Sequence, residues 1–202
     1  MYNCIFNAHC TEVFCDKSCP TLVETSYLLE RNGISMSSFV FSESQKNIDK
    51  MLSVLDKSKN RLGAYVANDS LNTVQAAELL SYCAICQNWK GSRLHCNVYN
   101  LKYSKYLEEL KKSWSMKSEP ESLEYMRIWS ESAKVLIVSN IDYVNFGDFE
   151  SQTLLNLIQN RMTGDLTTII VTPPLKDLVS GKPSIFFKSL KTKISEAIKV
   201  VG

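Results

Sequence analysis

The sequence has few of the residues that would give it an obvious catalytic role. Only 2 of its 202 residues are histidines, and 23 Lys and Arg against 21 Asp and Glu leave a net charge of +2. Charge this close to balance excludes a global electrostatic preference for nucleic acid, so any basic surface must be local. The chain contains no Gly-x-Ser-x-Gly elbow and no Gly-x-Gly-x-x-Gly loop. These absences argue against a serine hydrolase and against a dinucleotide-binding enzyme.

Long apolar segments are missing as well. No run approaches the roughly 20 apolar residues that a bilayer-spanning helix needs, so we expect no membrane association. The first residues, MYNCIFNAHC, lack the basic and then apolar regions of a secretory signal. A cytoplasmic location follows as an expectation. In a reducing compartment the 7 cysteines are expected to be thiols or metal ligands rather than disulfides.

The composition that is present is ordinary for a globular protein, with 45% hydrophobic and 22% charged residues. Residues 1–32 are predicted to form a cysteine-rich metal-binding segment with a short helix that starts at Pro20 or Thr21 and ends at Arg31, just before Gly33. Residues 33–60 are predicted to be a connector with one helix, which the spacing of Ile48, Met51, Leu52 and Leu55 indicates. Residues 61–202 then form one domain.

Strand and helix patterns alternate in this domain. The patterns predict strands at 62–67, 94–99, 134–139, 167–172 and 197–201, and helices at 71–88, 103–114, 123–130, 149–162 and 184–194. Segments 134–139 and 167–172 are apolar on both faces, as central strands of a parallel sheet are. The alternation predicts an α/β fold with three layers, in which helices cover both faces of a parallel sheet.

The segment RLGAYVANDSLNTVQ, residues 61–75, is the most informative part of this domain. It reads as a strand, a short loop and a helix start, which is where a nucleotide-binding α/β protein carries its phosphate loop. Such a loop needs glycines for close backbone approach to the phosphates and a lysine to meet their charge. Here Asn68 and Asp69 begin the turn instead, and Asp69 would repel a polyphosphate. We interpret the loop as a capped helix start, with Asp69 or Ser70 as the cap.

Residues 126–178 resemble the core of bacterial and phage helicase loaders of the DnaC type. In that family a strand of the type L-L-I-I-D-D-I is followed by a helix that ends near N-x-R, and then by P-T-I-x-T-S-N-L. Segments 135–141, 154–161 and 168–175 correspond to these three elements, and the order of elements from 62 to 201 also fits. The resemblance implies a P-loop NTPase-like fold of the AAA+ (ASCE) type.

The chain departs from this family at the residues that handle ATP. The acidic pair that positions Mg²⁺ is replaced by Ser139 and Asn140, with Asp142 as a displaced candidate acid. The polar sensor falls at Pro173 and Pro174, which have no side-chain donor. We therefore expect a degenerate ATPase that is not an enzyme and does not bind ATP.

Members of the resembled family contribute a basic residue, from a region late in the chain, to the neighbouring subunit's ATP site. Lys188 or Lys191 would be nearest to that position. Lysine lacks the planar fork of arginine, and the alternative interpretation is a solvated helix face.

The N-terminal cysteines have the spacing C-x5-C-x4-C-x3-C. Cys4, Cys10, Cys15 and Cys19 would provide the four ligands of a structural zinc ion, with His9 as a substitute for Cys10. An iron–sulfur cluster and free thiols are the alternatives. The remaining cysteines, at 83, 86 and 96, are predicted to be small buried hydrophobic residues.

One predicted helix combines basic and aromatic side chains. Lys102, Lys105, Lys111 and Lys112 are interleaved with Tyr103 and Tyr106. Lysines that meet phosphates and aromatics that stack on bases suit single-stranded nucleic acid. The alternative is an amphipathic helix whose lysines are solvated and whose aromatics lie in the core.

The resemblance and its departures together predict a non-catalytic DNA-replication accessory protein. It would bind a replicative helicase or an active AAA+ paralogue and join a hetero-oligomer. The cysteine-rich segment occupies the place where helicase loaders contact the helicase. The alternative is a module on an α/β scaffold that binds single-stranded nucleic acid such as single-stranded DNA.

Overall fold

The computed structural model of the chain describes residues 20–34, 45–67, 71–88, 96–143, 146–178 and 184–201. These ranges contain four strands and seven α-helices, with a 3₁₀ turn at Leu175–Asp177. The strands are β1 (Leu62–Val66), β2 (Val98–Lys102), β3 (Val135–Ser139) and β4 (Thr167–Thr172). The helices are α1 (Pro20–Arg31), α2 (Gln45–Lys57), α3 (Thr73–Asn88), α4 (Tyr103–Ser113), α5 (Glu121–Ser132), α6 (Asp148–Thr163) and α7 (Ile185–Val201). None of the helices in these ranges is both long and apolar enough to cross a membrane.

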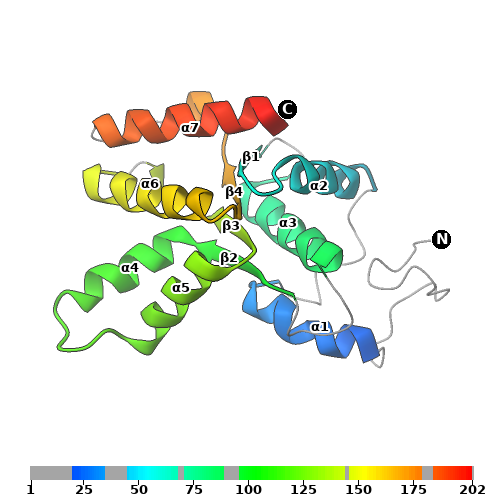
Figure 1. Cartoon of the computed structure of the whole chain (residues 1–202), viewed down its shortest axis with the longest axis horizontal. Helices are drawn as coiled ribbons and strands as arrows, with labels where there is room; N and C mark the ends of the chain where they lie inside the picture. Colours follow the sequence, from blue (N-terminus) through cyan, green and yellow to red (C-terminus); the bar gives the residue numbers. More distant parts are fainter. Residues whose placement is uncertain are drawn as a thin grey trace.

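The strands form one parallel sheet in the order β1-β4-β3-β2. Because β1 and β2 lie at opposite edges, the connection through α3 crosses the whole sheet, and the chain then steps back through β3 to β4. Crossover connections between parallel strands are right-handed. A connection that runs one way across the sheet and a connection that runs back therefore pack on opposite faces of the sheet. Figure 1 shows this arrangement, with α1, α2 and α3 on one side of the sheet and α4, α5 and α6 on the other. The predicted α/β fold, with a parallel sheet between two helical layers, is confirmed.

Each face of the sheet carries its own hydrophobic core. Along β3, Val135 and Ile137 point into the core under α1, α2 and α3, whereas Leu136 and Val138 point into the core under α4 to α7. The strand β4 alternates in the same way. The strands are therefore buried on both faces, which explains why their sequences are nearly continuous apolar runs. Met51 and Val54 of α2 also belong to the first core.

The end of α1 bonds to the edge strand β2. Arg31 Nη2 donates a hydrogen bond to Val98 O at 2.9 Å, and its guanidinium lies 4.0 Å from the ring centroid of Trp129. The helix ends at Arg31, as predicted, and Gly33 lies just past its end with a φ of 72°, which glycine readily adopts. Ile34 N then donates to Leu29 O at 2.9 Å. The Val98 carbonyl at this edge is therefore already bonded, which opposes pairing with a foreign strand.

Arg161, at the end of α6, is the largest fully buried side chain. All five of its N–H groups donate to uncharged acceptors. Three acceptors are carbonyls at the end of α5, from Ser130, Glu131 and Ala133, and two are Thr167 O and Thr168 Oγ1 at the start of β4, at distances between 2.7 and 3.2 Å. Burial lowers the pKa of Arg161 to about 10, so the group stays charged at neutral pH. It ties α5, α6 and β4 together.

Two predicted elements are corrected by the structure. The predicted strand at 197–201 is wrong, because α7 continues through Val201. Leu190, Ile194 and Ala197 recur at helical spacing and fill the second core, which keeps the segment helical. The predicted strand at 94–99 is displaced, since β2 runs from Val98 to Lys102. Its buried polar residue, Asn100, interrupts the apolar pattern on which the prediction relied.

Candidate functional site

The carboxyl ends of the strands meet at one edge of the sheet, which is where open α/β sheets bind their ligands. Of the residues assigned to the degenerate nucleotide site, Ser139 and Asn140 belong to this edge. Ser139 ends β3, Asn140 follows it, and α3 begins shortly after β1. Asn68 and Asp69 lie outside the described residues.

The start of α3 is closed by its own side chains. Asn72 Oδ1 accepts hydrogen bonds from Val74 N at 3.0 Å and from Gln75 N at 2.9 Å, and Asn72 N donates in return to Gln75 Oε1 at 3.2 Å. The cap is therefore Asn72, and the prediction of Asp69 or Ser70 is wrong. The sequence signal was available, since Asn-x-x-Gln is a variant of the capping box. These first-turn amides are the groups that would otherwise hold a phosphate.

The end of β3 is held by a buried polar chain. Ser139 is 3% exposed and donates from Oγ to Asn100 Oδ1 at 2.7 Å. Asn100 Nδ2 donates in turn to Asn32 O at 3.3 Å, just after α1. The chain of bonds links β3 through β2 to the end of α1. A neutral hydroxyl at position 139 therefore has a structural role of its own.

Asn140 fixes the beginning of α4. Its φ of 52° lies in the left-handed region that asparagine tolerates. Its carbonyl accepts hydrogen bonds from Ser104 N at 3.2 Å and from Ser104 Oγ at 2.5 Å. The second residue of the neutral pair thus connects the loop after β3 to a neighbouring helix through its backbone, while its side chain is exposed.

The end of β4 is bordered by aromatic side chains. Thr172 is buried, and Pro173 follows it. Tyr143 packs with Phe146 and Phe187 of α7 at ring-centroid distances of 5.4 and 6.4 Å. Burial raises the pKa of Tyr143 to about 12, so it stays neutral at physiological pH.

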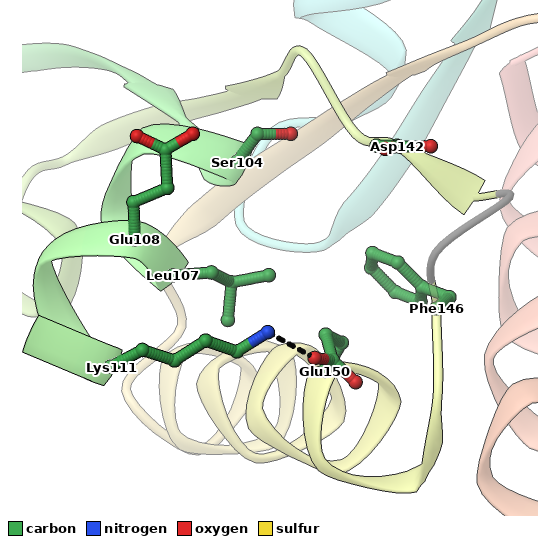
Figure 2. A pocket seen from close by; sticks show the side chains of 7 residues that line it. All are labelled: Ser104, Leu107, Glu108, Lys111, Asp142, Phe146 and Glu150. Carbon is green, nitrogen blue, oxygen red and sulfur yellow. Dashed lines mark hydrogen bonds and ion pairs between the residues drawn. The ribbon is translucent and has the colours of Figure 1, made fainter.

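A cavity of about 150 Å³ lies between α4 and the start of α6. Asp142 lines it, whereas no residue of α3 does. Figure 2 shows Lys111 of α4 reaching Glu150 of α6, with 2.7 Å between Nζ and Oε1. Burial opposes the charge of Glu150, but hydrogen bonds from Lys111 and from Gly147 N outweigh it and lower the pKa. The displaced acid Asp142 therefore lines a cavity together with residues of α4 and α6 rather than of α3.

The lysine–tyrosine helix is α4 with Lys102 before it. Tyr103 is fully buried and donates from its hydroxyl to Glu150 O at 2.8 Å, and Tyr106 is half-buried beside it. Tyr103 therefore fits the core interpretation rather than base stacking. Lys111 and Lys112 form ion pairs with Glu150 and Glu109. Lys102 and Lys105 are exposed, and the Lys102 charge partly offsets the effect of burial on the raised pKa of Glu78.

The other predicted sites are placed only in part. Lys188 is exposed on α7, whereas Lys191 donates from Nζ to Leu178 O at 3.0 Å. The predicted zinc ligands Cys4, Cys10, Cys15, Cys19 and His9 lie outside the described residues. In the part of the chain that is described, no three His, Cys, Asp or Glu side chains converge on a metal position.

The cysteines within the described ranges are core residues, as predicted. Cys83, Cys86 and Cys96 are all buried and unbridged. Burial raises the pKa of Cys83 to about 12 and that of Cys96 to about 11. The thiolate forms of Cys83 and Cys96 are therefore scarce at neutral pH, which makes these two residues poor nucleophiles.

No known protein family, no curated protein and no solved structure matches this chain. The resemblance to helicase loaders therefore rests on the pattern and spacing of this chain's own residues.

Proposed function

We propose that the chain is a non-catalytic DNA-replication accessory protein, a helicase-loader-like pseudo-ATPase that binds a replicative helicase or an active AAA+ paralogue. The observation that carries the proposal is the closed start of α3. In a P-loop protein the amides at this helix start cradle phosphates. Here the backbone amides of Val74 and Gln75 donate to the Asn72 side chain, and the Asn72 N–H donates to the Gln75 side chain. These three donors are therefore already bonded within the protein.

The sheet supports the P-loop-like part of this proposal. The first strand lies at an edge, the chain crosses to the far edge through α3, and the later strands return toward it in sequence order. This places the beginning of α3 and the ends of β3 and β4 at one edge of the sheet, as an ATPase of this type requires. A four-stranded parallel sheet is compatible with that fold without being specific to it.

The groups at the other two positions support the loss of catalysis. Mg²⁺-dependent hydrolysis needs a carboxylate near the metal and a polar group that orients the attacking water. Ser139 instead bonds to Asn100 inside the protein, and Pro173 follows β4. Each replacement is neutral, and the hydroxyl of Ser139 is already committed to a structural bond. The fold can therefore pack against a partner protein, whereas these positions supply no groups for ATP hydrolysis.

The partner contacts that we propose lie outside this edge. The cysteine-rich segment, held by a structural zinc ion, would contact the helicase, because it occupies the place of the partner-binding region in helicase loaders. Lys188, exposed on α7, would face a neighbouring subunit in a hetero-oligomer. Binding of single strands by α4 has weaker support, since Tyr103 is buried and Lys111 and Lys112 are ion-paired.

Affinity capture from the native host tests this proposal directly. The tagged full-length chain is expected to recover a replicative helicase or another AAA+ protein, identified by mass spectrometry and then rebuilt from purified components. Cys4→Ser combined with Cys15→Ser, or prior treatment with a zinc chelator, is expected to abolish recovery, because metal binding supplies the folding free energy of so short a segment. Ser18→Ala in the same segment is the matched control.

Recovery of neither class of protein, with or without chelator, would refute the proposal. Recovery that the Cys4→Ser and Cys15→Ser changes leave intact would refute the role of the cysteine-rich segment alone.

A further inference from the structure

The only Asn-Gly dipeptide of the chain, Asn32-Gly33, lies directly after α1. In such a dipeptide the glycine nitrogen can attack the asparagine side chain, because glycine has no Cβ to hinder the approach. A bond forms from Gly33 N to Asn32 Cγ, and the side-chain nitrogen leaves as ammonia together with the proton of the Gly33 N–H. Water then opens the resulting succinimide ring to aspartate or isoaspartate. In isoaspartate the main chain is longer by a methylene group.

The folded chain withholds the reacting groups. Asn32 is 1% exposed, and its Nδ2 donates a hydrogen bond to Leu28 O at 2.7 Å. Gly33 N, the attacking atom, donates to Glu30 O at 2.9 Å. Attack needs a Gly33 nitrogen that has given up its proton, and ring opening needs water at the Asn32 carbonyl carbons. The reaction therefore requires the end of α1 to detach from the sheet.

The contacts that hold this end in place are few and specific. Arg31 bonds to the Val98 carbonyl and stacks on Trp129, as described above, and Asn32 O accepts from Asn100 Nδ2 at 3.3 Å. In contrast, none of the described donors reaches the buried Asn32 Oδ1. A buried acceptor without a donor destabilises the closed arrangement. Local opening at this end is therefore less costly than unfolding of the sheet.

The isoaspartate product does not fit the closed arrangement. The bonds from Gly33 N to Glu30 O and from Ile34 N to Leu29 O depend on the normal spacing of the main chain, which an added methylene group changes. Leu28 O also loses its donor, because the side-chain nitrogen has left. A buried carbonyl without a donor is costly, so the modified end does not return to its place on β2.

We propose that Asn32-Gly33 is a deamidation site that the closed end of α1 protects, and that its conversion to isoaspartate makes the detachment of α1 permanent. Detachment frees the Val98 carbonyl at the edge strand β2. The device acts in one direction, because ammonia is lost and the reverse reaction has no nitrogen donor. The proposal goes beyond the assembly role argued above and does not depend on it.

Mass spectrometry of the full-length protein tests the protection. Cleavage after lysine releases residues 18–46, in which Asn32 is the only asparagine. The blocked peptide Leu-Leu-Glu-Arg-Asn-Gly-Ile, in the same buffer, gives the rate of the unprotected dipeptide. Conversion in the protein is expected to be about tenfold slower or more. Hydrogen exchange of the Gly33 N–H is expected to be slowed by a similar factor, because both reactions need the same opening.

A pair of variants tests what holds the site closed. Arg31→Ala removes the bond to Val98 O and the contact with Trp129, and it is expected to speed conversion about threefold or more. Arg127→Ala, a matched change at an exposed arginine of α5, is expected to leave the rate unchanged. Hydrogen exchange of the β3 and β4 amides shows in each case whether the sheet itself stays closed.

Converted protein tests whether the release is permanent. The chain is incubated unfolded in urea at alkaline pH, refolded, and its isoaspartate form is isolated by ion exchange. The control passes through the same steps at mildly acidic pH, where ring closure is slow. The amides of residues 28–34 are expected to exchange about tenfold faster or more in the isoaspartate form than in the control, whereas those of β3 and β4 are expected to be unchanged.

Each of three results would overturn the proposal. They are conversion as fast in the intact protein as in the peptide, an unchanged rate in the Arg31→Ala protein, and an isoaspartate form in which residues 28–34 exchange as in the control. Faster exchange throughout the sheet of the isoaspartate form would also overturn it, because the change would then be global unfolding. Partner recovery by fresh protein with intact Asn32 tests the proposed function separately.

Discussion

Replacing Arg161 by leucine is expected to lower the free energy of unfolding by about 3–5 kcal/mol, because it leaves several buried acceptors without a donor. Leucine cannot donate to the carbonyls of Ser130, Glu131 and Ala133, which lie at the end of α5 where no intrahelical partner exists. The positive charge of Arg161 is also stabilised here, because it lies at the carboxyl end of α5, where the helix dipole is negative.

A buried cation is costly in itself, so removing the charge of Arg161 offsets part of the lost free energy of unfolding. Arg161→Lys is therefore an informative companion. Lysine keeps the charge but has three donors at one point, and it cannot reach acceptors on both α5 and β4. We expect a loss of about 2–4 kcal/mol for this variant. The free energy of unfolding of a natural domain is only about 5–15 kcal/mol, so either change removes a large share of it.

Urea unfolding followed by circular dichroism measures these effects. Arg127→Leu is the matched control, because Arg127 lies exposed on α5 and its guanidinium meets Glu119 at 3.5 Å. Its expected cost is below about 0.5 kcal/mol. An Arg161→Leu protein within about 1 kcal/mol of the unmodified chain would show that Arg161 does not tie α5 to β4.

Replacing Ser139 by aspartate, the residue type that a working ATPase would carry here, is expected to cost about 2–4 kcal/mol. The site is buried, and its one side-chain partner presents Asn100 Oδ1, an acceptor that would repel a carboxylate. Asn100 cannot turn its amide toward the new group without giving up the bond from its Nδ2 to Asn32 O. The same unfolding measurement applies.

Two controls separate burial from charge. Ser139→Ala removes the hydrogen bond without adding charge, and about 1–2 kcal/mol is expected. Asn140→Asp adds a carboxylate one residue later, where the side chain is exposed and a φ of 52° suits either residue, so little change is expected. If Ser139→Asp is as stable as Asn140→Asp, the buried polar chain from β3 to α1 does not restrict position 139.

The sequence predicted the parts of the fold that depend on runs of similar residues. The strands β3 and β4 are apolar on both faces, and their patterns indicate a parallel sheet at once. Asn100 and the end of α7 were mispredicted for opposite reasons. Asn100 places a polar group inside a strand because Ser139 and Asn32 bond to it across the sheet, and no local pattern records such partners. Residues 197–201 are β-branched enough to resemble a strand, although Ala197 extends the helical face of α7 into the core.

The candidate site was predictable from the sequence only where it depends on residues that are close together along the chain. The absent phosphate loop and the neutral Ser139–Asn140 pair are visible in the sequence, and so is the Asn72–Gln75 capping box, although it was assigned to the wrong residues. The five bonds of Arg161 and the ion pair of Lys111 with Glu150 depend on segments that are far apart along the chain. Only the packing of α4, α5 and α6 brings them together.

Titration with a fluorescent ATP analogue in the presence of Mg²⁺ tests the central claim most directly. A closed α3 start without a lysine or a metal-binding carboxylate predicts no saturable binding up to about 1 mM nucleotide, with an active P-loop ATPase as the positive control. Saturable binding in the micromolar range that unlabelled ATP competes away would contradict the account, because it would show that this edge of the sheet still holds a nucleotide.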